Sequence, residues 1–453
     1  MNSINKPSNL FYLLMLATVL FLSPSCKKYL DEKTDKKLVV PSTLQDAATL
    51  MDSYGLLNSF YPALGILSDD DFYFTTSSFN TEGILSQSNY TWAKDVYNEN
   101  EWGYLYQMLL FANISLETLE KVELNNLNAA EWNRVKGTAL FFRANTFYNV
   151  TQYYAQPYVK ATASQQLGIP LRLDSDPNKV SVRSSLQQSY DRIIADLSEA
   201  VQLLPVTNIV FSRPTKAAAF GELARVYLNM GEYALAKQNA DSSLSYSSNL
   251  LDYNSINSIP AYPFAMWNAE EIFPSTMFVY FGNQNMLVDS FLYRSYDNND
   301  LRKSLFFKVS SGGAYSFRGS YEGTSNPFGG LTVAELLLIH AEANARLGNK
   351  TAALADLNSL LIKRYKTGTL VPVTAGDAAE ALVKILTERR KELLSRGQRW
   401  SDLRRLNLEP QFAKTLIRVV NGQTYTLPPN DPRYTHYIPA QVISISGMQQ
   451  NPR

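Results

Sequence analysis

The feature that most constrains the fold is a helix-pair pattern that occurs twice in the chain. Residues 217–244 carry spaced apolar and small residues, a break at Gly231, and then a second helical stretch. Residues 337–360 repeat this arrangement around Gly348. Small residues at helix crossings let two antiparallel helices approach closely, as they do in tetratricopeptide repeats. The pattern predicts a mainly α fold, built on a tetratricopeptide-like helical-repeat scaffold.

Other segments support a helical body. Residues 104–122 and 132–154 are amphipathic, with apolar side chains at helical spacing. Three helix starts carry a capping side chain three residues before a Glu or Gln: Ser185, Thr332 and Asp377. We therefore expect long helices across most of the chain.

Two aromatic-rich stretches interrupt the helical pattern. Residues 59–106 and 250–331 lack helical periodicity and concentrate Trp, Tyr and Phe. Long irregular segments in a helical protein are usually folded insertions or functional surfaces. The sequence thus predicts irregular, aromatic-rich loop insertions on the helical scaffold.

Aromatic side chains on loops suggest a ligand class. Sugar rings pack their C–H faces on flat aromatic rings, while their hydroxyls need polar partners. The candidate ligand-binding residues are Trp92, Tyr97, Trp102, Trp267, Tyr280 and Tyr293. Each ring could instead be buried within its own loop, so the hypothesis depends on their clustering.

An acidic run, Asp69, Asp70 and Asp71, lies in the first aromatic-rich stretch. Carboxylates are ligands that Ca²⁺ prefers, so the run is a weak candidate for a structural calcium site. The alternative is a solvated acidic loop or helix start.

The composition excludes several function classes. Basic residues number 42 and acidic residues 41, so no electrostatic footprint for nucleic acid is present. The chain has two histidines, His340 and His436, and none of the nucleotide-binding, hydrolase or metalloprotease motifs we sought. A histidine-based triad is disfavoured because His340 falls on the packed face of its expected helix. A glycosidase needs only two carboxylates, and composition leaves that possibility open.

The N-terminus is typical of an exported lipoprotein. Residues 10–22 form an apolar run that is shorter than the about 20 residues a membrane-spanning helix needs. The single cysteine, Cys26, follows at once, in a segment that resembles the lipobox where a thiol receives a diacylglycerol. Leu22 lies one position further from the cysteine than in the usual pattern. We predict a signal peptide over residues 1–25 and lipidation at Cys26, with a small buried cysteine as the alternative.

Several motifs carry a family resemblance across the mature chain. They include LLIHAEANARLG at 337–348, ERRKEL at 388–393, GQRWSDLRR at 397–405, and the ending with IPA at 438–440 and QNP at 450–452. With the lipobox, these motifs resemble the SusD/RagB family of nutrient-uptake lipoproteins. The charged motifs also have the i, i+3 and i, i+4 spacing of ion pairs on a helix surface. Asn344 stands where the first helix pair has Tyr227.

The resemblance implies a function as well as a fold. Members bind glycans or peptides, are anchored by lipid at the outer membrane of Gram-negative cells, and act without catalysis beside a SusC-like, TonB-dependent barrel. It implies a non-enzymatic lipoprotein with no cofactor that faces the cell exterior and binds an oligosaccharide, with a peptide as the less favoured ligand. The alternatives are a helical-repeat scaffold for envelope assembly and a carboxylate-based glycosidase.

The implied organisation divides the chain into five regions. These are a signal peptide at 1–25, a lipidated cysteine and tether at 26–40, an N-terminal SusD-like helical region at 41–245, an irregular ligand-facing insertion at 246–331, and a C-terminal SusD/RagB helical region at 332–453.

Overall fold

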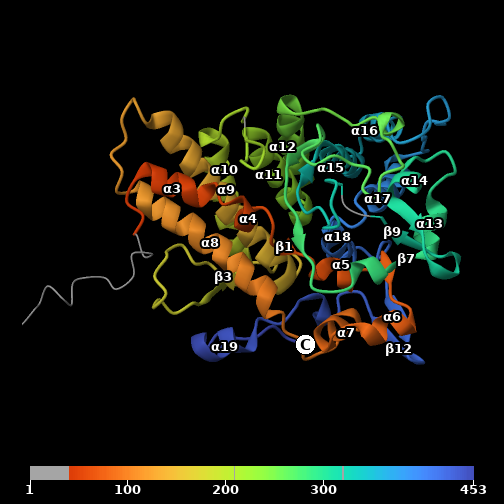
Figure 1. The fold of residues 1–453 in the computed structure, drawn as a ribbon, viewed down its shortest axis with the longest axis horizontal. Helices are drawn as coiled ribbons and strands as arrows, with labels where there is room; N and C mark the ends of the chain where they lie inside the picture. Colours follow the sequence, from red (N-terminus) through yellow and green to blue (C-terminus); the bar gives the residue numbers. More distant parts are fainter. Residues whose placement is uncertain (1–39, 209, 319–320) are drawn as a thin grey trace, which may run out of the picture. The chain divides into compact units, whose positions relative to one another are not determined.

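Helices make up about half of the protein, seen in a computed structural model that describes residues 40–208, 210–318 and 321–453. The helices are α3 (Leu44–Met51), α4 (Tyr54–Leu57), α5 (Leu64–Ser68), α6 (Thr76–Thr81), α7 (Ile84–Tyr90), α8 (Glu99–Leu119), α9 (Ala129–Tyr154), α10 (Leu186–Leu203), α11 (Lys216–Met230), α12 (Tyr233–Tyr246), α13 (Ser290–Ser295), α14 (Arg302–Phe306), α15 (Val333–Arg346), α16 (Lys350–Leu361), α17 (Ala378–Glu392), α18 (Gln398–Leu406) and α19 (Ala440–Ser446). Consecutive helices pack on one another from α8 to α12, and α15 packs on α12, α16 and α17 (Figure 1). The mainly helical prediction is confirmed.

Strands are short and pair in twos. They are β1 (Tyr61–Pro62), β2 (Phe72–Tyr73), β3 (Leu167–Pro170), β4 (Arg183–Ser185), β5 (Glu271–Phe273), β6 (Met277–Phe278), β7 (Leu287–Val288), β8 (Phe307–Val309), β9 (Tyr315–Phe317), β10 (Leu331–Thr332), β11 (Leu416–Val420) and β12 (Gln423–Leu427). β1 and β6 are parallel, whereas β2 with β7, β3 with β4, β5 with β10, β8 with β9 and β11 with β12 are antiparallel. These short strand pairs connect loops to the helical body and do not form a separate sheet layer.

The two predicted helix pairs are α11 with α12 and α15 with α16. Gly231 ends α11 at a left-handed φ of 75°, and Gly348 follows α15 at a φ of 84°. Glycine adopts this conformation without the cost of a Cβ, so the chain can reverse there. A Cβ built on Gly221 would lie 2.4 Å from the Leu331 side chain, so small residues do permit the close packing of α11.

The aromatic-rich stretches differ from the prediction in one respect. Residues 59–106 are not one irregular segment, because they contain α5, α6, α7 and the first turns of α8. Short strand pairs join this stretch to the other one: Tyr61 is in register with Met277 in the β1–β6 pair, and Phe72 with Val288 in the β2–β7 pair. Two regions that lie far apart in the sequence therefore form one part of the fold.

The charged cluster around α17 is buried, although its spacing is typical of a solvent-facing helix. Glu392 is fully buried and accepts from Arg302 at 3.1 Å and Arg364 at 2.9 Å. Burial alone would raise the pKa of Glu392, but Arg364 and Arg302 outweigh it and lower that pKa. Arg364 also binds Glu270 at 2.9 Å, so the charged motif ties α17 to the insertion beside β5.

Candidate functional site

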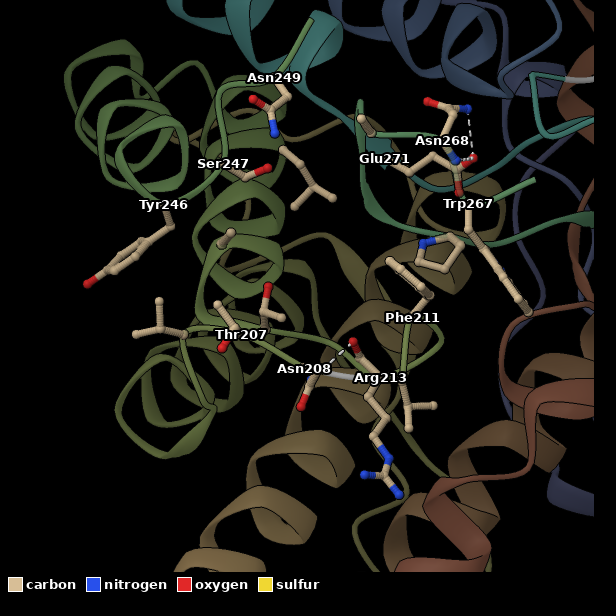
Figure 2. A pocket seen from close by; sticks show the side chains of 17 residues that line it. Thr207, Asn208, Phe211, Arg213, Tyr246, Ser247, Asn249, Trp267, Asn268 and Glu271 are labelled. Atoms are coloured by element: carbon tan, nitrogen blue, oxygen red, sulfur yellow. Dashed lines mark hydrogen bonds between the residues drawn. The ribbon is translucent and has the colours of Figure 1, made fainter. Parts of the chain in front are cut away.

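A cavity of about 310 Å³ opens where three segments of the chain meet. The connection between α10 and α11 forms one wall, the residues after α12 form another, and the segment leading into β5 forms the third (Figure 2). The helices hold these three connections in place, which is the usual way that a rigid scaffold presents binding residues.

Two exposed aromatic rings lie side by side at this cavity. Trp267 stacks on Phe211 with ring centroids 5.8 Å apart and planes 14° apart. Trp267 is 43% exposed and Phe211 is 61% exposed. Tyr54 meets Trp267 edge-on at 6.5 Å. Together Trp267 and Phe211 form a stacked pair of exposed rings, which we call the aromatic platform.

Trp267 also adopts an unusual backbone conformation. Its φ is 55°, in the left-handed region that bulky side chains rarely occupy. Such a conformation costs of order 1–3 kcal/mol and persists only where surrounding structure imposes it. The neighbouring Asn268 imposes it here, since its side-chain amide donates to the backbone oxygens of Ala265 at 3.3 Å and Tyr321 at 3.0 Å.

Polar side chains surround the platform. Asn208 donates to the backbone oxygen of Pro214 at 2.8 Å, and Arg213 forms a two-point ion pair with Asp52 at 2.8 and 2.7 Å. Both interactions hold the α10–α11 connection. Within the described part of the chain, the side chains of Ser247 and Asn249 make no hydrogen bond. These two groups are available to ligand hydroxyls.

Glu271 is the one carboxylate among the described residues that line this cavity. Burial raises the pKa of Glu271 to about 8, although the backbone N–H of Asn268 donates to the carboxylate and opposes the shift. Its Oε1 accepts from the Asn268 amide at 2.8 Å, while its buried Oε2 has no hydrogen-bond partner among the described residues. At neutral pH this carboxyl group is therefore largely protonated and can donate a hydrogen bond.

Of the six aromatic candidates, only Trp267 lines the cavity. Trp92 is 3% exposed, and its Nε1 donates to the backbone oxygen of Ser68 at 2.9 Å. Trp102 is 6% exposed and stacks on Tyr106 at 4.6 Å. Both rings belong to the hydrophobic core, although Trp102 also borders a separate surface pocket.

The three tyrosine candidates are partly buried, each with an aromatic neighbour of its own. Tyr97 stacks on Tyr437 at 5.6 Å, Tyr280 meets Phe281 edge-on at 5.4 Å, and Tyr293 stacks on Tyr315 at 3.6 Å. The structure thus does not gather the six residues into one site.

Sequence reasoning missed Phe211, which completes the aromatic platform. It lies between Pro205 and Pro214 in the short connection between α10 and α11. An aromatic residue in such a proline-bounded loop has few neighbours to cover it, and this signal could have found it. Its pairing with Trp267 was not readable, because the two residues are far apart in the chain.

The acidic run 69–71 contacts basic side chains from the C-terminal region. Asp70 binds Arg399 at 2.6 Å and Lys414 at 2.7 Å, and Asp71 binds Arg390 at 2.8 Å. Burial opposes ionisation of Asp70, but Arg399 and Arg390 outweigh it and hold its pKa well below the usual range. The solvated-loop alternative is wrong for Asp69 and Asp71, which are buried. Asp71 is paired with Arg390, whereas the Asp69 carboxylate accepts from the backbone N–H of Asp71 at 2.9 Å.

The predicted signal peptide, Cys26 and residues 26–39 of the tether lie outside the described residues. In the described ranges, no helix combines the length and the apolar character needed to cross a membrane.

Two family models match most of the chain. One, described as starch-binding associating with outer membrane, matches residues 28–228, and that of the SusD family matches residues 265–451. SusD-like protein P2 of Formosa agariphila is 30% identical over 140 residues, which cover 31% of this chain and 25% of that protein. The chain thus matches about a quarter of the length of this relative.

Solved structures share the fold. A SusD superfamily protein of Bacteroides thetaiotaomicron has a TM-score of 0.74 at 22% identity, with 91% of this chain and 100% of that chain covered. A laminarin-binding SusD-like protein has a TM-score of 0.66 at 17% identity, with 90% and 97% covered. At these sequence identities the structural similarity establishes the fold alone. The aromatic platform is the feature of this chain that bears on its function.

Proposed function

This chain belongs to the SusD family, and from that premise we propose that it is a non-catalytic glycan-binding lipoprotein of the outer membrane. The family model that matches its N-terminal half describes an association with that membrane. The observation that carries the proposal is the aromatic platform of Trp267 and Phe211 beside free polar side chains.

The platform suits a sugar ring better than a peptide. Its two rings are nearly parallel and partly open to solvent, so the C–H face of a pyranose can pack on an outer face of the pair. Ser247 and Asn249 supply donors and acceptors for ring hydroxyls. A laminarin-binding protein with the same fold supports an oligosaccharide as the ligand.

Catalysis is not needed to explain this cavity. Hydrolysis of a glycosidic bond ordinarily requires two carboxyl groups on opposite sides of the bond. Among the described lining residues only Glu271 carries one. Prolonged incubation with a bound glycan should therefore release no product, and detection of shortened oligosaccharides by chromatography would instead support the glycosidase alternative.

The proposal extends to transport. A SusC-like, TonB-dependent barrel would receive the bound oligosaccharide, and a lipid at Cys26 would hold both proteins in one membrane. Confinement to the membrane raises the effective concentration of each for the other. Fatty-acid labelling of cells should mark the wild-type protein and not Cys26→Ala, while label retained by the variant would contradict lipidation.

Binding to the platform can be tested directly with soluble glycans. Isothermal titration of the purified protein against laminarin, starch and other oligosaccharides should identify a ligand. Trp267→Ala should weaken that binding by about tenfold, since aromatic stacking contributes about 0.5–1.5 kcal/mol beyond the apolar area that it buries. Tyr262→Ala is a matched control, because Tyr262 is 38% exposed and does not line the cavity.

Two results would contradict this assignment. Equal binding by Trp267→Ala and wild type would place the glycan elsewhere on the protein. Binding of no glycan, together with a stable complex with an envelope-assembly factor, would favour the scaffold alternative.

A further inference from the structure

A second cavity of about 310 Å³ is lined by other residues than the cavity at the aromatic platform. It forms where α13, α17 and α18 meet the segment that follows α18. The acidic run 69–71 adjoins it, because the backbone N–H of Asp289, at the start of α13, donates to the oxygen of Asp71 at 2.8 Å. We call it the arginine-floored cavity.

Two arginines, Arg390 and Arg399, contribute side chains to its lining, and their side chains are 18% and 15% exposed. Among the described residues that line this cavity, none carries a carboxylate. Each guanidinium binds the acidic run through Nε and one terminal nitrogen. In the part of the chain that the structure describes, no hydrogen bond engages the Nη1 of either arginine.

Positive charge exceeds negative charge at this floor. The Asp70 carboxylate is shared by Arg399 at 2.6 Å, Lys414 at 2.7 Å and Arg390 at 3.4 Å. Asp71 adds a second carboxylate, which faces Arg390 at 2.8 Å. Three cations therefore face the carboxylates of Asp70 and Asp71, while burial and the neighbouring Asp71 raise the pKa of Asp69 well above its usual range and oppose a third negative charge there. A further anion would be attracted to the remaining N–H groups.

The walls of the arginine-floored cavity are apolar. Its apolar lining residues are Phe291, Leu292, Val383, Leu386, Leu406 and Phe412. Phe291 is 76% exposed and Val383 is 52% exposed, although both are large apolar side chains. Arg294 lies over the Phe291 ring at 4.8 Å and adds a further positive charge at the rim. Exposed apolar side chains that line one cavity are typical of interaction sites.

We propose that the arginine-floored cavity is a docking site for a protein segment that carries a carboxylate next to an apolar side chain. The apolar side chain would pack against Phe291, Val383 and Leu386, and the carboxylate would accept from the free Nη1 groups. A sugar fits poorly, because Ser295 and Thr387 are the only uncharged polar side chains among the described lining residues. This proposal is independent of the glycan assignment.

A pair of short peptides tests this chemistry. The probes are acetylated and amidated Gly-Phe-Glu-Leu-Gly and its Gln counterpart, with binding to the purified protein followed by fluorescence anisotropy. The Glu peptide should bind about tenfold more tightly than the Gln peptide, since hydrogen bonds to a charged carboxylate are stronger than those to a neutral amide. Added salt should reduce this difference, because the attraction is partly screened.

Substitutions of an exposed residue at the rim of the cavity test the proposal without disturbing the fold. Val383 is half exposed on α17, so both Val383→Glu and Val383→Lys should fold normally. Val383→Glu should weaken the Glu peptide by about tenfold through repulsion, whereas Val383→Lys should not weaken it. Glycan binding should be unchanged in both variants, which separates this proposal from the first.

Three outcomes would overturn the proposal. Equal affinity for the Glu and Gln peptides would show that the two arginines do not bind the carboxylate. Equal effects of Val383→Glu and Val383→Lys would show that charge at the rim does not matter. Binding to phosphatidylglycerol vesicles that Val383→Glu abolishes, without selectivity between the peptides, would identify a lipid surface as the partner.

Discussion

The two aromatic-rich stretches each contain a tryptophan at positive φ, yet the two side chains have opposite surroundings. Trp92 has a φ of 52° and is 3% exposed, while Trp267 has a φ of 55° and is 43% exposed. Burial of a Trp ring stabilises the folded state by enough to offset the backbone cost at Trp92. Trp267 has no comparable burial. Under the proposed function, Trp267 is held in place for binding, whereas Trp92 is held by packing.

The surroundings of the two rings explain the contrast. The Arg418 guanidinium, from the β11 strand, lies 4.4 Å from the centre of the Trp92 ring and covers it. The Trp267 ring has Phe211 at one face, and Phe211 is itself exposed. A distant strand thus covers the Trp92 ring, whereas the contact with the α10–α11 connection leaves the Trp267 ring open to solvent.

The largest expected effect is on stability. Trp92→Ala and Trp102→Ala should each lower the free energy of unfolding by about 3–5 kcal/mol, because each removes a buried ring and leaves a cavity. Trp267→Ala should lower it by less than about 1 kcal/mol, since its ring is nearly half exposed. Urea denaturation followed by circular dichroism measures all three. If Trp267→Ala lowers the free energy of unfolding as much as Trp102→Ala does, the proposed difference between the two stretches is wrong.

The next effect concerns pH. Glu101 in the first stretch is buried, and its Oε1 accepts from the backbone N–H groups of Ala63 and Leu64, both at 2.9 Å. Burial raises the pKa of Glu101 to about 8, although those two N–H groups oppose the shift.

Because the folded state binds this proton more tightly than the unfolded state, the Glu101 contribution is retained at low pH. It is lost as pH rises from about 4.5 to about 8. The free energy of unfolding should therefore decrease less steeply with pH in Glu101→Gln than in the wild type. The two slopes should differ by up to about 1.4 kcal/mol per pH unit in this range. Denaturation at pH 5, 6 and 7 measures the slope. An unchanged slope would mean that Glu101 is ionised in the folded protein.

A smaller effect isolates the backbone conformation at the two tryptophans. Trp267→Gly should be about 1 kcal/mol more stable to unfolding than Trp267→Ala, because glycine adopts a left-handed φ without the Cβ cost. The same difference should separate Trp92→Gly from Trp92→Ala, on top of the larger loss from burial. If alanine is the more stable replacement at Trp267, the positive φ is not maintained in solution.

The smallest stability change is expected at Phe211. Phe211→Ala should change the free energy of unfolding by no more than about 0.5 kcal/mol, since Phe211 is 61% exposed. Glycan affinity should nevertheless fall several-fold, because one of the two platform rings is lost. Phe291→Ala is a matched control, as Phe291 is 76% exposed and lies at the arginine-floored cavity. A variant of Phe211 that binds glycan normally would restrict the site to Trp267.

Much of the scaffold was predictable from local patterns. The breaks at Gly231 and Gly348 marked both helix pairs, and Ser185 caps α10 with Gln188 as its spacing indicates. These features depend on residues only a few positions apart, so they can be read along the chain. Residues 59–106 were harder, because their short helices lack the length that makes a periodic pattern visible.

The candidate site was predictable only in part. Trp267 was identified from its place in an aromatic-rich stretch, whereas Phe211 and the unpaired polar groups of Ser247 and Asn249 were not. Trp92 and Trp102 had the same local signal as Trp267 and proved to be buried. Composition identifies which side chains can bind a sugar but not which of them face solvent.

The sequence by itself determined the helix pairs, their caps and the family, because these are encoded by residue type and short spacing. Tertiary structure alone decided which rings are exposed and which charges are paired. Arg418 covers Trp92, and Arg390 binds Asp71, across more than 300 positions of the chain. Such contacts form only when distant segments pack together, so local periodicity in the sequence does not predict them.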